Sequence, residues 1–364
     1  MLEDYEVPLT IREIEVEEPG AGEVRVRIAV SGVCHTDEHV IQGELPLPLP
    51  MVLGHEAAGV VDRVGADVDD LAEGDHVVLS WLPACGHCKA CLAGWTGMCR
   101  ETARAAEKGT LWQGAHRLWM DGRPLNVMSL TGTFSPYAVV PRAGVVPIDR
   151  DLPMREAALL GCSAVTGYGS VAHSAQVGAG ASVTVLGVGG VGLHVVQAAR
   201  LFGAERIFAI DRFPVRLAEA ARLGATDLIE AGPGALTEVL DRTGGLGTDF
   251  AFEVVGTPET IAQAFNVIRP GGTAVVIGVA APHEEVSLNA FAFPSQGKTL
   301  KGTWYGGGNL AEDVAALVAA RREGRIDLAS FVGDAYRLDD VNAAFEALRA
   351  GAARRPVVLL DASA

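Results

Sequence analysis

Apolar and polar residues alternate strictly near the start of the chain. In GEVRVRIAVSGVC, residues 22–34, every second residue from Val24 to Val30 is apolar, whereas Arg25 and Arg27 lie between them. A period of two is typical of a strand with one buried face. Further short apolar runs, VVDRVG and GDHVVLS, are interrupted by Gly and Asp. The first 150 residues are therefore predicted to be β-rich with long loops.

The pattern changes near residue 165, where apolar strands and helical repeats begin to alternate. Thr257 and Pro258 form an N-cap and a first-turn proline for one of the helices. Alternating strands and helices predict a parallel, doubly wound sheet. The predicted strands are residues 182–186, 206–210, 250–255 and 274–278, and the predicted helices are residues 190–201, 215–223 and 258–268.

The end of the chain predicts one more helix and one more strand. Asp339 is the expected N-cap, and Gly351 is the expected stop. The segment RRPVVLL then has the apolar run of a strand. The apolar face of this helix comprises Val341, Ala344, Phe345 and Leu348.

Composition and charge narrow the class of protein. A chain of 364 residues with 49% hydrophobic and 20% charged residues predicts a globular protein of two domains. The net charge of −16 argues against nucleic acid or an anionic membrane as the main partner. The first ten residues, MLEDYEVPLT, lack the basic and apolar regions of a signal peptide, and no apolar run reaches about 18 residues. We therefore expect a soluble, cytoplasmic protein.

Four of the six cysteines crowd into one short segment. Cys85, Cys88, Cys91 and Cys99 have the spacing C-x2-C-x2-C-x7-C. Four thiolates complete a tetrahedral zinc shell and leave no position for a substrate, which is typical of a structural site. The alternative is a group of buried or redox-active cysteines. His87 lies inside the segment, and we expect it to be an exposed bystander.

A glycine-rich turn follows the predicted strand at 182–186. The turn is GVGGVG, residues 187–192, and it opens a predicted helix, while Asp211 ends the next strand. In this context the glycines let the backbone approach a pyrophosphate at a helix N-terminus, and the acid binds ribose hydroxyls. A carboxylate repels a 2′-phosphate, so NAD is favoured over NADP. A turn in a flavin or other nucleotide domain is the alternative, and Arg212 leaves some room for NADP.

Cys34, His55 and Cys162 are the remaining candidates for chemistry. Taken singly, each could be a buried structural residue, which is the commoner case for a lone cysteine or histidine, and no spacing rule joins residues so far apart. The residues themselves therefore do not prove a second metal site.

From about residue 10 to its end, the chain resembles the zinc-dependent medium-chain alcohol dehydrogenases. The matching stretches are GVCHTDEH, LGHEAAG, GDHVV, the four-cysteine loop, GCSAVTGYGS, VLGVGGVG and AFEVVG. The spacing from Cys34 to His55, Cys99, Cys162 and Gly187 fits the longer-loop branch of that family. The resemblance implies a β-rich GroES-like catalytic domain and a Rossmann domain.

The resemblance also implies a catalytic zinc held by Cys34, His55 and Cys162, with the fourth position open to water or substrate. Glu56 and Asp37 match acidic residues that belong to the surroundings of this metal and orient its ligands. Two zinc ions per chain, one catalytic and one structural, are therefore expected.

Two further residues match a proton path. Thr36 matches the hydroxyl residue that takes the alcohol proton, and His39 matches the histidine that passes it to solvent through the cofactor ribose. Zinc lowers the pKa of a bound oxygen, so a bound alcohol can lose its proton near neutral pH. The alternative for both residues is an ordinary polar turn before a helix.

The family match assigns further residues to cofactor and substrate. The residues implied at the cofactor are His35, Thr166, Gly187, Gly189, Gly190, Val191, Gly192, Asp211, Arg216, Val254, Ile277, Val279 and Arg355. The residues implied at the substrate are Leu45, Trp81, Met128 and Trp304. The two indoles would give flat apolar walls suited to an aromatic or long unbranched primary alcohol. Alternatively, they pack the domain junction.

Some features depart from the family pattern. The chain begins about eight residues too late for the first strand of the family, and His35 replaces an arginine found in some members. GDHVVLSWLPACGHC and SLTGTFSPYAVVP resemble the nicotinoprotein branch, which keeps NAD bound. GVCHTDEH is also similar to the formaldehyde-oxidising branch, but the apolar segment 45–50, with only Glu44 nearby, lacks that branch's acidic residues.

These observations together predict reversible oxidation of a small, primary or aromatic alcohol to its aldehyde, with hydride transfer to NAD. One alternative is oxidation of a thiol–formaldehyde adduct, and another is a non-catalytic redox sensor that binds zinc and NAD. The catalytic domain is expected at residues 1–163 and 305–364, the NAD domain at residues 164–304, and a cleft at their junction. A homodimer is expected through residues 299–304 and 279–288, without a nucleic-acid or membrane partner.

Overall fold

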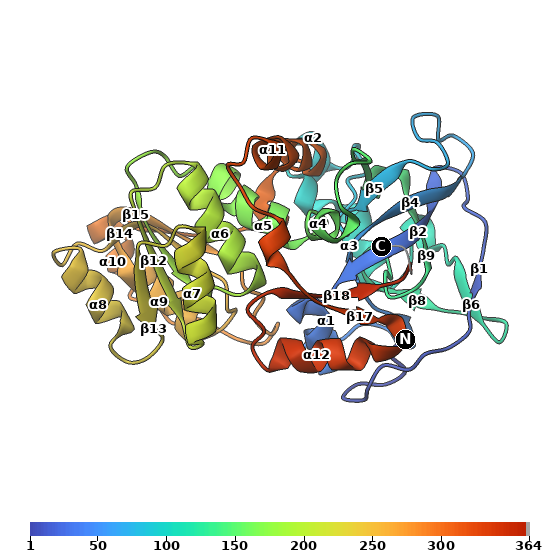
Figure 1. Ribbon diagram of the computed structural model, residues 1–364. Coiled ribbons are helices and arrows are strands. Elements are labelled where there is room, and N and C mark those ends of the chain that lie inside the picture. Colours follow the sequence, from blue (N-terminus) through green and yellow to red (C-terminus); the bar gives the residue numbers. More distant parts are fainter. Residues whose placement is uncertain (362–364) are drawn as a thin grey trace. The chain divides into compact units, whose positions relative to one another are not determined.

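The computed structural model describes residues 1–361, which form two compact units (Figure 1). Unit 1 comprises Met1–Cys162, Asn309–Ala315 and Asp327–Ala364, of which the description ends at residue 361. Unit 2 comprises Ser163–Gly308 and Ala316–Ile326. The expected division placed everything after residue 304 in one domain, whereas helix α11 (Leu310–Arg322) contributes residues to both units.

Unit 1 is built on a seven-stranded sheet in the order β10-β5-β4-β2-β18-β17, with β9 also paired to β2. Strand β2 (Glu23–Gly32) is its centre, and it pairs antiparallel with β4, β9 and β18. Val24, Val26 and Ile28 are fully buried, whereas Arg25 and Arg27 are not. The period-two pattern therefore identified this strand and its buried face correctly.

Unit 1 also contains two smaller sheets, β1-β6-β7 and β3-β8. Its strands are β1 (Glu15–Val16), β3 (Met51–Val52), β4 (Glu56–Val64), β5 (His76–Leu79), β6 (Leu118–Met120), β7 (Arg123–Pro124), β8 (Asn126–Val127), β9 (Tyr137–Pro141), β10 (Val145–Pro147), β17 (Val332–Arg337) and β18 (Arg355–Leu359). Its helices are α1 (His35–Ile41), α2 (Lys89–Leu92), α3 (Arg100–Glu107), α4 (Met154–Leu159) and α12 (Val341–Arg349).

The start of the chain pairs with the first residue of strand β3. Leu2 and Met51 exchange two backbone hydrogen bonds of 2.8 and 2.9 Å in an antiparallel bridge. Leu2 is completely buried. The start of the chain thus forms a single bridge to Met51.

Helix α12 begins one residue later than its sequence signal suggested. Leu338–Asp340 forms a single 3-10 turn, so Asp340 rather than Asp339 occupies the N-cap. Asp339 lies within this tighter turn, so the α-helix begins only at Val341. Its expected apolar face is buried.

Unit 2 contains a six-stranded, wholly parallel sheet in the order β13-β12-β11-β14-β15-β16. The strand order reverses between β11 and β14, which makes their carboxyl ends the topological switch point where such sheets bind ligands. The doubly wound parallel sheet expected from the sequence is confirmed. Its strands are β11 (Ser182–Leu186), β12 (Arg206–Asp211), β13 (Asp227–Glu230), β14 (Thr248–Glu253), β15 (Ile268–Val276) and β16 (Thr299–Gly302).

The helices of unit 2 accompany this sheet (Figure 1). Thr257 caps α9 by accepting a hydrogen bond from the backbone of Thr260, as its sequence predicted. Strand β14 ends at Glu253, two residues before the expected end, because the Glu253 side chain binds the backbone of the following turn. The helices are α5 (Ser163–Gly169), α6 (Gly190–Leu201), α7 (Pro214–Leu223), α8 (Ala235–Arg242), α9 (Pro258–Val267) and α10 (Ala292–Gln296). Within residues 1–361, none of the helices combines the length and apolarity needed to cross a membrane.

Candidate active site and metal centres

Cys34, His55 and Cys162 lie together in unit 1. Their potential ligand atoms are all within 4.8 Å of one another, and the three residues are buried. Cys34 immediately precedes α1, His55 immediately precedes β4, and Cys162 follows α4. The fold thus brings together three donors that the sequence could join only through a family resemblance.

Asp37 orients two of these donors from the first turn of α1. One of its oxygens accepts a hydrogen bond from the backbone of Gly54 at 2.9 Å, and the other accepts from the backbone of Cys34 at 3.2 Å. The carboxylate also lies 3.3 Å from His55 Nδ1, and both side chains are buried. An imidazole engaged through Nδ1 leaves Nε2 as its metal-binding atom. Burial opposes the charged form of His55, but the charge and hydrogen bond of Asp37, with Cys34, raise its pKa well above 6.5.

The pKa values of the two thiols of this group are shifted in opposite directions. The hydrogen bond with Cys162 holds the pKa of Cys34 well below 9.0 despite burial, and the same bond, with burial, raises the pKa of Cys162 well above it. Two thiolates and one imidazole, with no fourth protein donor in the group among residues 1–361, are a recognised catalytic zinc set. The donors present therefore fit zinc with one open position.

Glu56, expected in the acidic surroundings of the metal, lies outside the group of three donors. Its Oε2 lies 2.9 Å from Arg355 Nε in an ion pair with side chains 0% and 4% exposed. Gly32 makes room for the pair, because a Cβ there would lie 2.2 Å from Glu56 Oε2. Arg355 Nη1 also donates to the Val33 carbonyl at 3.2 Å. Arg355, expected at the pyrophosphate, thus has its guanidinium engaged beside the metal ligands.

Helix α1 carries the three polar residues expected after Cys34. Thr36 Oγ1 is 3.6 Å from Cys34 Sγ, so this hydroxyl borders the donor group. His39 lies one turn further along and forms a hydrogen-bonded pair through Nδ1 with Glu44. His35, at the start of the helix, is exposed.

The expected substrate residues occupy different environments. The Trp81 ring meets the His55 ring edge-on with centroids 5.8 Å apart, which places an indole beside the metal ligands. Met128 is 1% exposed and belongs to an apolar cluster with Leu53, against which Leu45 packs. Met128 is therefore part of the packed core. Trp304 belongs to unit 2 and is 37% exposed.

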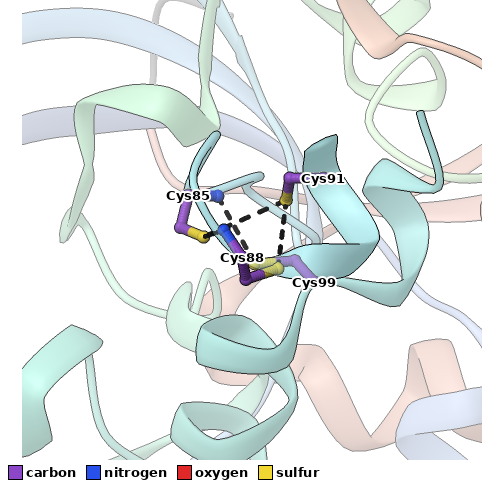
Figure 2. A group of neighbouring side chains, drawn as sticks. All are labelled: Cys85, Cys88, Cys91 and Cys99. Carbon is purple, nitrogen blue, oxygen red and sulfur yellow. Dashed lines mark hydrogen bonds between the residues drawn. The ribbon is translucent and has the colours of Figure 1, made fainter. Parts of the chain in front are cut away.

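The four-cysteine segment forms a second donor group (Figure 2). All four sulfur atoms lie within 4.8 Å of one another, with Cys88 and Cys91 sulfurs 3.5 Å apart. Backbone hydrogen bonds from Cys91 and Arg100 lower the pKa of Cys88 to about 6. His87 is exposed and directs Nδ1 to the Cys85 carbonyl at 2.9 Å, outside the group. Four thiols without a fifth candidate fit the closed shell of a structural zinc.

The glycine turn of unit 2 has the close approaches that a nucleotide turn requires. Gly187 has φ +87°, and a Cβ at Gly192 would lie 1.9 Å from the Gly187 carbonyl oxygen. The two oxygens of Asp211 accept backbone hydrogen bonds from Val188 and Phe213, each 2.9 Å long. Asp211 therefore ties the glycine turn to the end of β12. This turn fits a dinucleotide, because bare backbone meets a helix N-terminus there.

Arg216 stands next to this carboxylate. Its Nη1 is 3.8 Å from Asp211 Oδ2, and both Arg216 and Arg212 lie over the Phe213 ring at 4.7 and 4.8 Å. A Cβ at Gly189 would come within 3.6 Å of the Arg216 guanidinium. The remaining cofactor predictions lie in unit 2 as follows: Thr166 within α5, Gly190 and Val191 at the start of α6, Val254 directly after β14, and Ile277 and Val279 after β15.

Sequence reasoning missed Glu253, the last residue of β14. It is fully buried, and its Oε1 accepts hydrogen bonds from Val255, Gly256 and Thr260. Burial raises the pKa of this carboxyl above 4.5. The available signal was an acid closing an otherwise apolar strand at the switch point.

Known proteins share both halves of this architecture. Residues 20–150 match the alcohol dehydrogenase GroES-like domain, and residues 190–320 match the zinc-binding dehydrogenase domain. The chain is 33% identical to an alcohol dehydrogenase zinc-binding domain protein from Burkholderia ambifaria, with a TM-score of 0.94 over 99% of this chain and 97% of that one. It is 30% identical to the benzyl alcohol dehydrogenase of Acinetobacter calcoaceticus, with a TM-score of 0.90 over 96% and 94%. It is also 28% identical to alcohol dehydrogenase TADH from Thermus sp. ATN1, with a TM-score of 0.78 over 95% and 96%.

Proposed function

We propose a specific reaction for this chain, which belongs to the zinc-dependent medium-chain alcohol dehydrogenase family and is an oxidoreductase. The reaction is the reversible oxidation of an uncharged, hydrophobic primary alcohol, aromatic or long and unbranched, to its aldehyde. NAD is the hydride acceptor, and Cys34, His55 and Cys162 hold the catalytic zinc.

One observation carries this proposal: a buried set of three donors coexists with a separate set of four. Cys34, His55 and Cys162 leave one coordination position for a substrate, whereas the four-cysteine group leaves none. A protein that needed zinc only for structure would not require the open set. The proposal therefore assigns two zinc ions with different roles.

When bound, zinc supplies Lewis acidity and NAD supplies the hydride acceptor. The residues of the chain perform the remaining tasks. Asp37 holds His55 and the backbone of Cys34 in place, and the Glu56–Arg355 pair puts charge of both signs behind the thiols. Thr36 lies at the edge of the donor group, where its hydroxyl can take the alcohol proton. His39 then serves as the exit for that proton on the exposed side of α1.

The surroundings of the donor group support an uncharged substrate. Trp81 presents an aromatic ring beside His55, and Leu45 begins an apolar loop. A neighbour of similar structure is a benzyl alcohol dehydrogenase. Glu44, the acidic residue next to this loop, is paired with His39. Its carboxylate is therefore already engaged, which disfavours the alternative in which acidic residues here bind a thiol–formaldehyde adduct.

The preference for NAD and the homodimer belong to the same proposal. Asp211 carries negative charge at the end of β12, where an additional phosphate on the ribose would be repelled.

Among the described strands, β16 pairs only with β15, so its other edge can extend the sheet into a second copy. Phe291 and Phe293, shortly before that edge strand, are 75% and 38% exposed. A dimer would bury such side chains.

A substrate panel tests the proposal directly. Purified protein would be assayed with benzyl alcohol, hexanol and a branched secondary alcohol, with NAD, with NADP and without added cofactor, alongside metal analysis. We expect two zinc ions per chain, turnover of the two primary alcohols and a higher kcat/KM with NAD. Turnover without added NAD, in the presence of an artificial acceptor, would identify a permanently bound cofactor. Absence of alcohol turnover in the zinc-loaded protein would overturn the proposal and favour the redox sensor, whereas selective oxidation of a thiol–formaldehyde adduct would favour the other alternative.

The tryptophans offer a test of the substrate class. Trp81→Ala should open the space beside the His55 ring and raise the relative kcat/KM for the branched secondary alcohol, and Trp304→Ala is assayed separately with the same three alcohols. Discrimination should shift by roughly 1–3 kcal/mol per methylene-sized change. Unchanged ratios across the three alcohols in both variants would show that neither indole shapes specificity.

A further inference from the structure

The pairing of His39 with Glu44 is a feature that the sequence did not reveal. His39 Nδ1 and Glu44 Oε2 lie within hydrogen-bond distance. The two side chains are 30% and 53% exposed, so the pair lies at the boundary with water. His39 is the residue to which we assign the exit of the proton, and its partner therefore bears on the reaction.

The backbone after α1 places Glu44 beside this ring. Gly43 adopts φ +72°, a left-handed conformation that glycine accommodates readily, and its amide donates to the Val40 carbonyl at 3.1 Å. The chain then turns back, and the amide of Leu45 donates to the carbonyl of His39 itself at 3.0 Å. Glu44 is thus held between two residues that are bonded to the end of the helix.

The loop that carries Glu44 is also held by apolar packing and by a hydrogen bond from Tyr5. Leu45, Leu47 and Leu49 pack against the apolar cluster that contains Leu53. Tyr5 donates from its hydroxyl to the Leu47 carbonyl at 2.6 Å. The position of Glu44 therefore follows from a packed loop rather than from the reach of a long side chain.

Other charges near His39 are already paired. Glu38, the preceding residue, accepts hydrogen bonds from Gln42 and from Arg349 of α12, each at 2.8 Å. Asp37 is buried against His55, with 3.3 Å between a carboxylate oxygen and Nδ1 of that ring. Glu44 is accordingly the carboxylate in hydrogen-bond contact with the His39 ring among the described residues.

We propose that Glu44 is a positioning residue for His39, which accepts the Nδ1 hydrogen and so fixes the tautomer whose Nε2 can take a proton. This inference rests on the proposed function, in which His39 carries away the alcohol proton. A neutral imidazole that donates through one nitrogen accepts through the other. Each alcohol oxidised releases one proton, which Nε2 of His39 accepts while the Nδ1 hydrogen stays on the ring and is donated to the Glu44 carboxylate. Nε2 then releases the proton to water, which restores the neutral starting tautomer.

Nitrogen NMR of the zinc-loaded protein tests the tautomer without any turnover. Protein labelled with ¹⁵N at histidine would be compared with His39→Gln to assign the signal among nine histidines. We expect a protonated Nδ1 and an unprotonated Nε2 in the wild type. Glu44→Ala, which removes the acceptor, should shift the ring toward the other tautomer. Glu44→Gln keeps a carbonyl acceptor without the charge and should retain the first tautomer.

Kinetics then separates positioning from a general effect of the substitution. Glu44→Ala should lower kcat by about tenfold, as for loss of a residue that orients a working histidine, with little change in KM. Its solvent isotope effect should rise, and small buffer bases should restore part of the rate. Glu38→Gln is the matched control, because it removes a neighbouring carboxylate that pairs with Arg349 and not with His39; its kinetics should equal those of the wild type.

Two outcomes would overturn the inference. One is an unchanged tautomer in Glu44→Ala, and the other is a rate loss in Glu44→Ala that is matched by Glu38→Gln and not relieved by added bases. Failure of the proposed function has a different signature. In that case the wild type would not oxidise alcohols at all, while the NMR measurement would still report whether Glu44 sets the tautomer.

Discussion

Breaking the buried ion pair of Glu56 and Arg355 should have a large effect on the stability of unit 1. Their charged atoms are 2.9 Å apart, and the side chains are 0% and 4% exposed. Arg355→Met keeps an apolar stem of similar length but leaves the Glu56 carboxylate in the interior without its counter-ion. The Val33 carbonyl also loses a charged donor at 3.2 Å.

The magnitude follows from the burial of both groups. Removing one partner of a buried pair costs about 3–5 kcal/mol, because the remaining charge is uncompensated. Since 1 kcal/mol corresponds to about 2–4 °C in Tm for a protein of moderate size, unit 1 should melt roughly 6–20 °C lower. Removing both charges in Glu56→Gln/Arg355→Met should restore at least half of that loss, since a neutral amide is less costly to bury than a carboxylate.

Thermal unfolding of the zinc-loaded variants provides the assay, with zinc content measured in parallel. Arg349→Met is the matched control, because its ion pair with Glu38 has an arginine side chain 47% exposed. Such a pair contributes about 0.2–1 kcal/mol, so the control should melt close to the wild type. The reasoning is refuted if Arg355→Met melts with the control, or if the double variant is no more stable than the single one.

Four further outcomes are expected. Cys162→Ala should abolish activity and remove one zinc ion while leaving Tm nearly unchanged. Cys91→Ala should remove the other zinc ion and lower Tm. Full activity of the purified wild type with one zinc ion or none contradicts both expectations. Asp211→Ala should raise the Kd for NAD and narrow the preference over NADP, and a wild type with the higher kcat/KM for NADP contradicts this. Asp249 should stabilise the fold above pH 3.8: although burial opposes its charge, hydrogen bonds from Ser182 and an ion pair with Arg269 lower its pKa. Its folded pKa lies below the unfolded value, so this stability is lost as the pH falls through the folded pKa. Urea unfolding should therefore show a loss in Asp249→Ala at pH 7 that shrinks toward pH 3, and a loss independent of pH contradicts the assignment.

The family resemblance predicted the GroES-like domain, and local sequence patterns predicted the Rossmann sheet. Period-two alternation in β2, the glycine turn at 187–192 and Thr257 before α9 are local signals, because each depends on residues that are neighbours in the chain. The four cysteines between 85 and 99 are local in the same sense, and their closed set could be inferred from spacing. Element ends were less certain: α12 began at Val341 rather than after Asp339, since one tight turn intervened.

Other features depended on the tertiary structure. Cys34, His55 and Cys162 come from three separate connections around β2, β4 and α4, and only the pairing of those strands brings them together. Sequence alone could not assign Arg355 to Glu56, since a guanidinium can meet either a cofactor phosphate or a buried carboxylate.

Packing also decided which side chains are core and which are polar partners. Met128, which the resemblance assigned to the substrate, is packed in an apolar cluster, and Glu44, the acid next to segment 45–50, pairs with His39. Periodicity identifies the buried face of an element, because burial repeats with the backbone geometry. Periodicity does not identify which residue of another element packs against that face. This partner depends on strand register and on the path of loops, which carry no periodic signal.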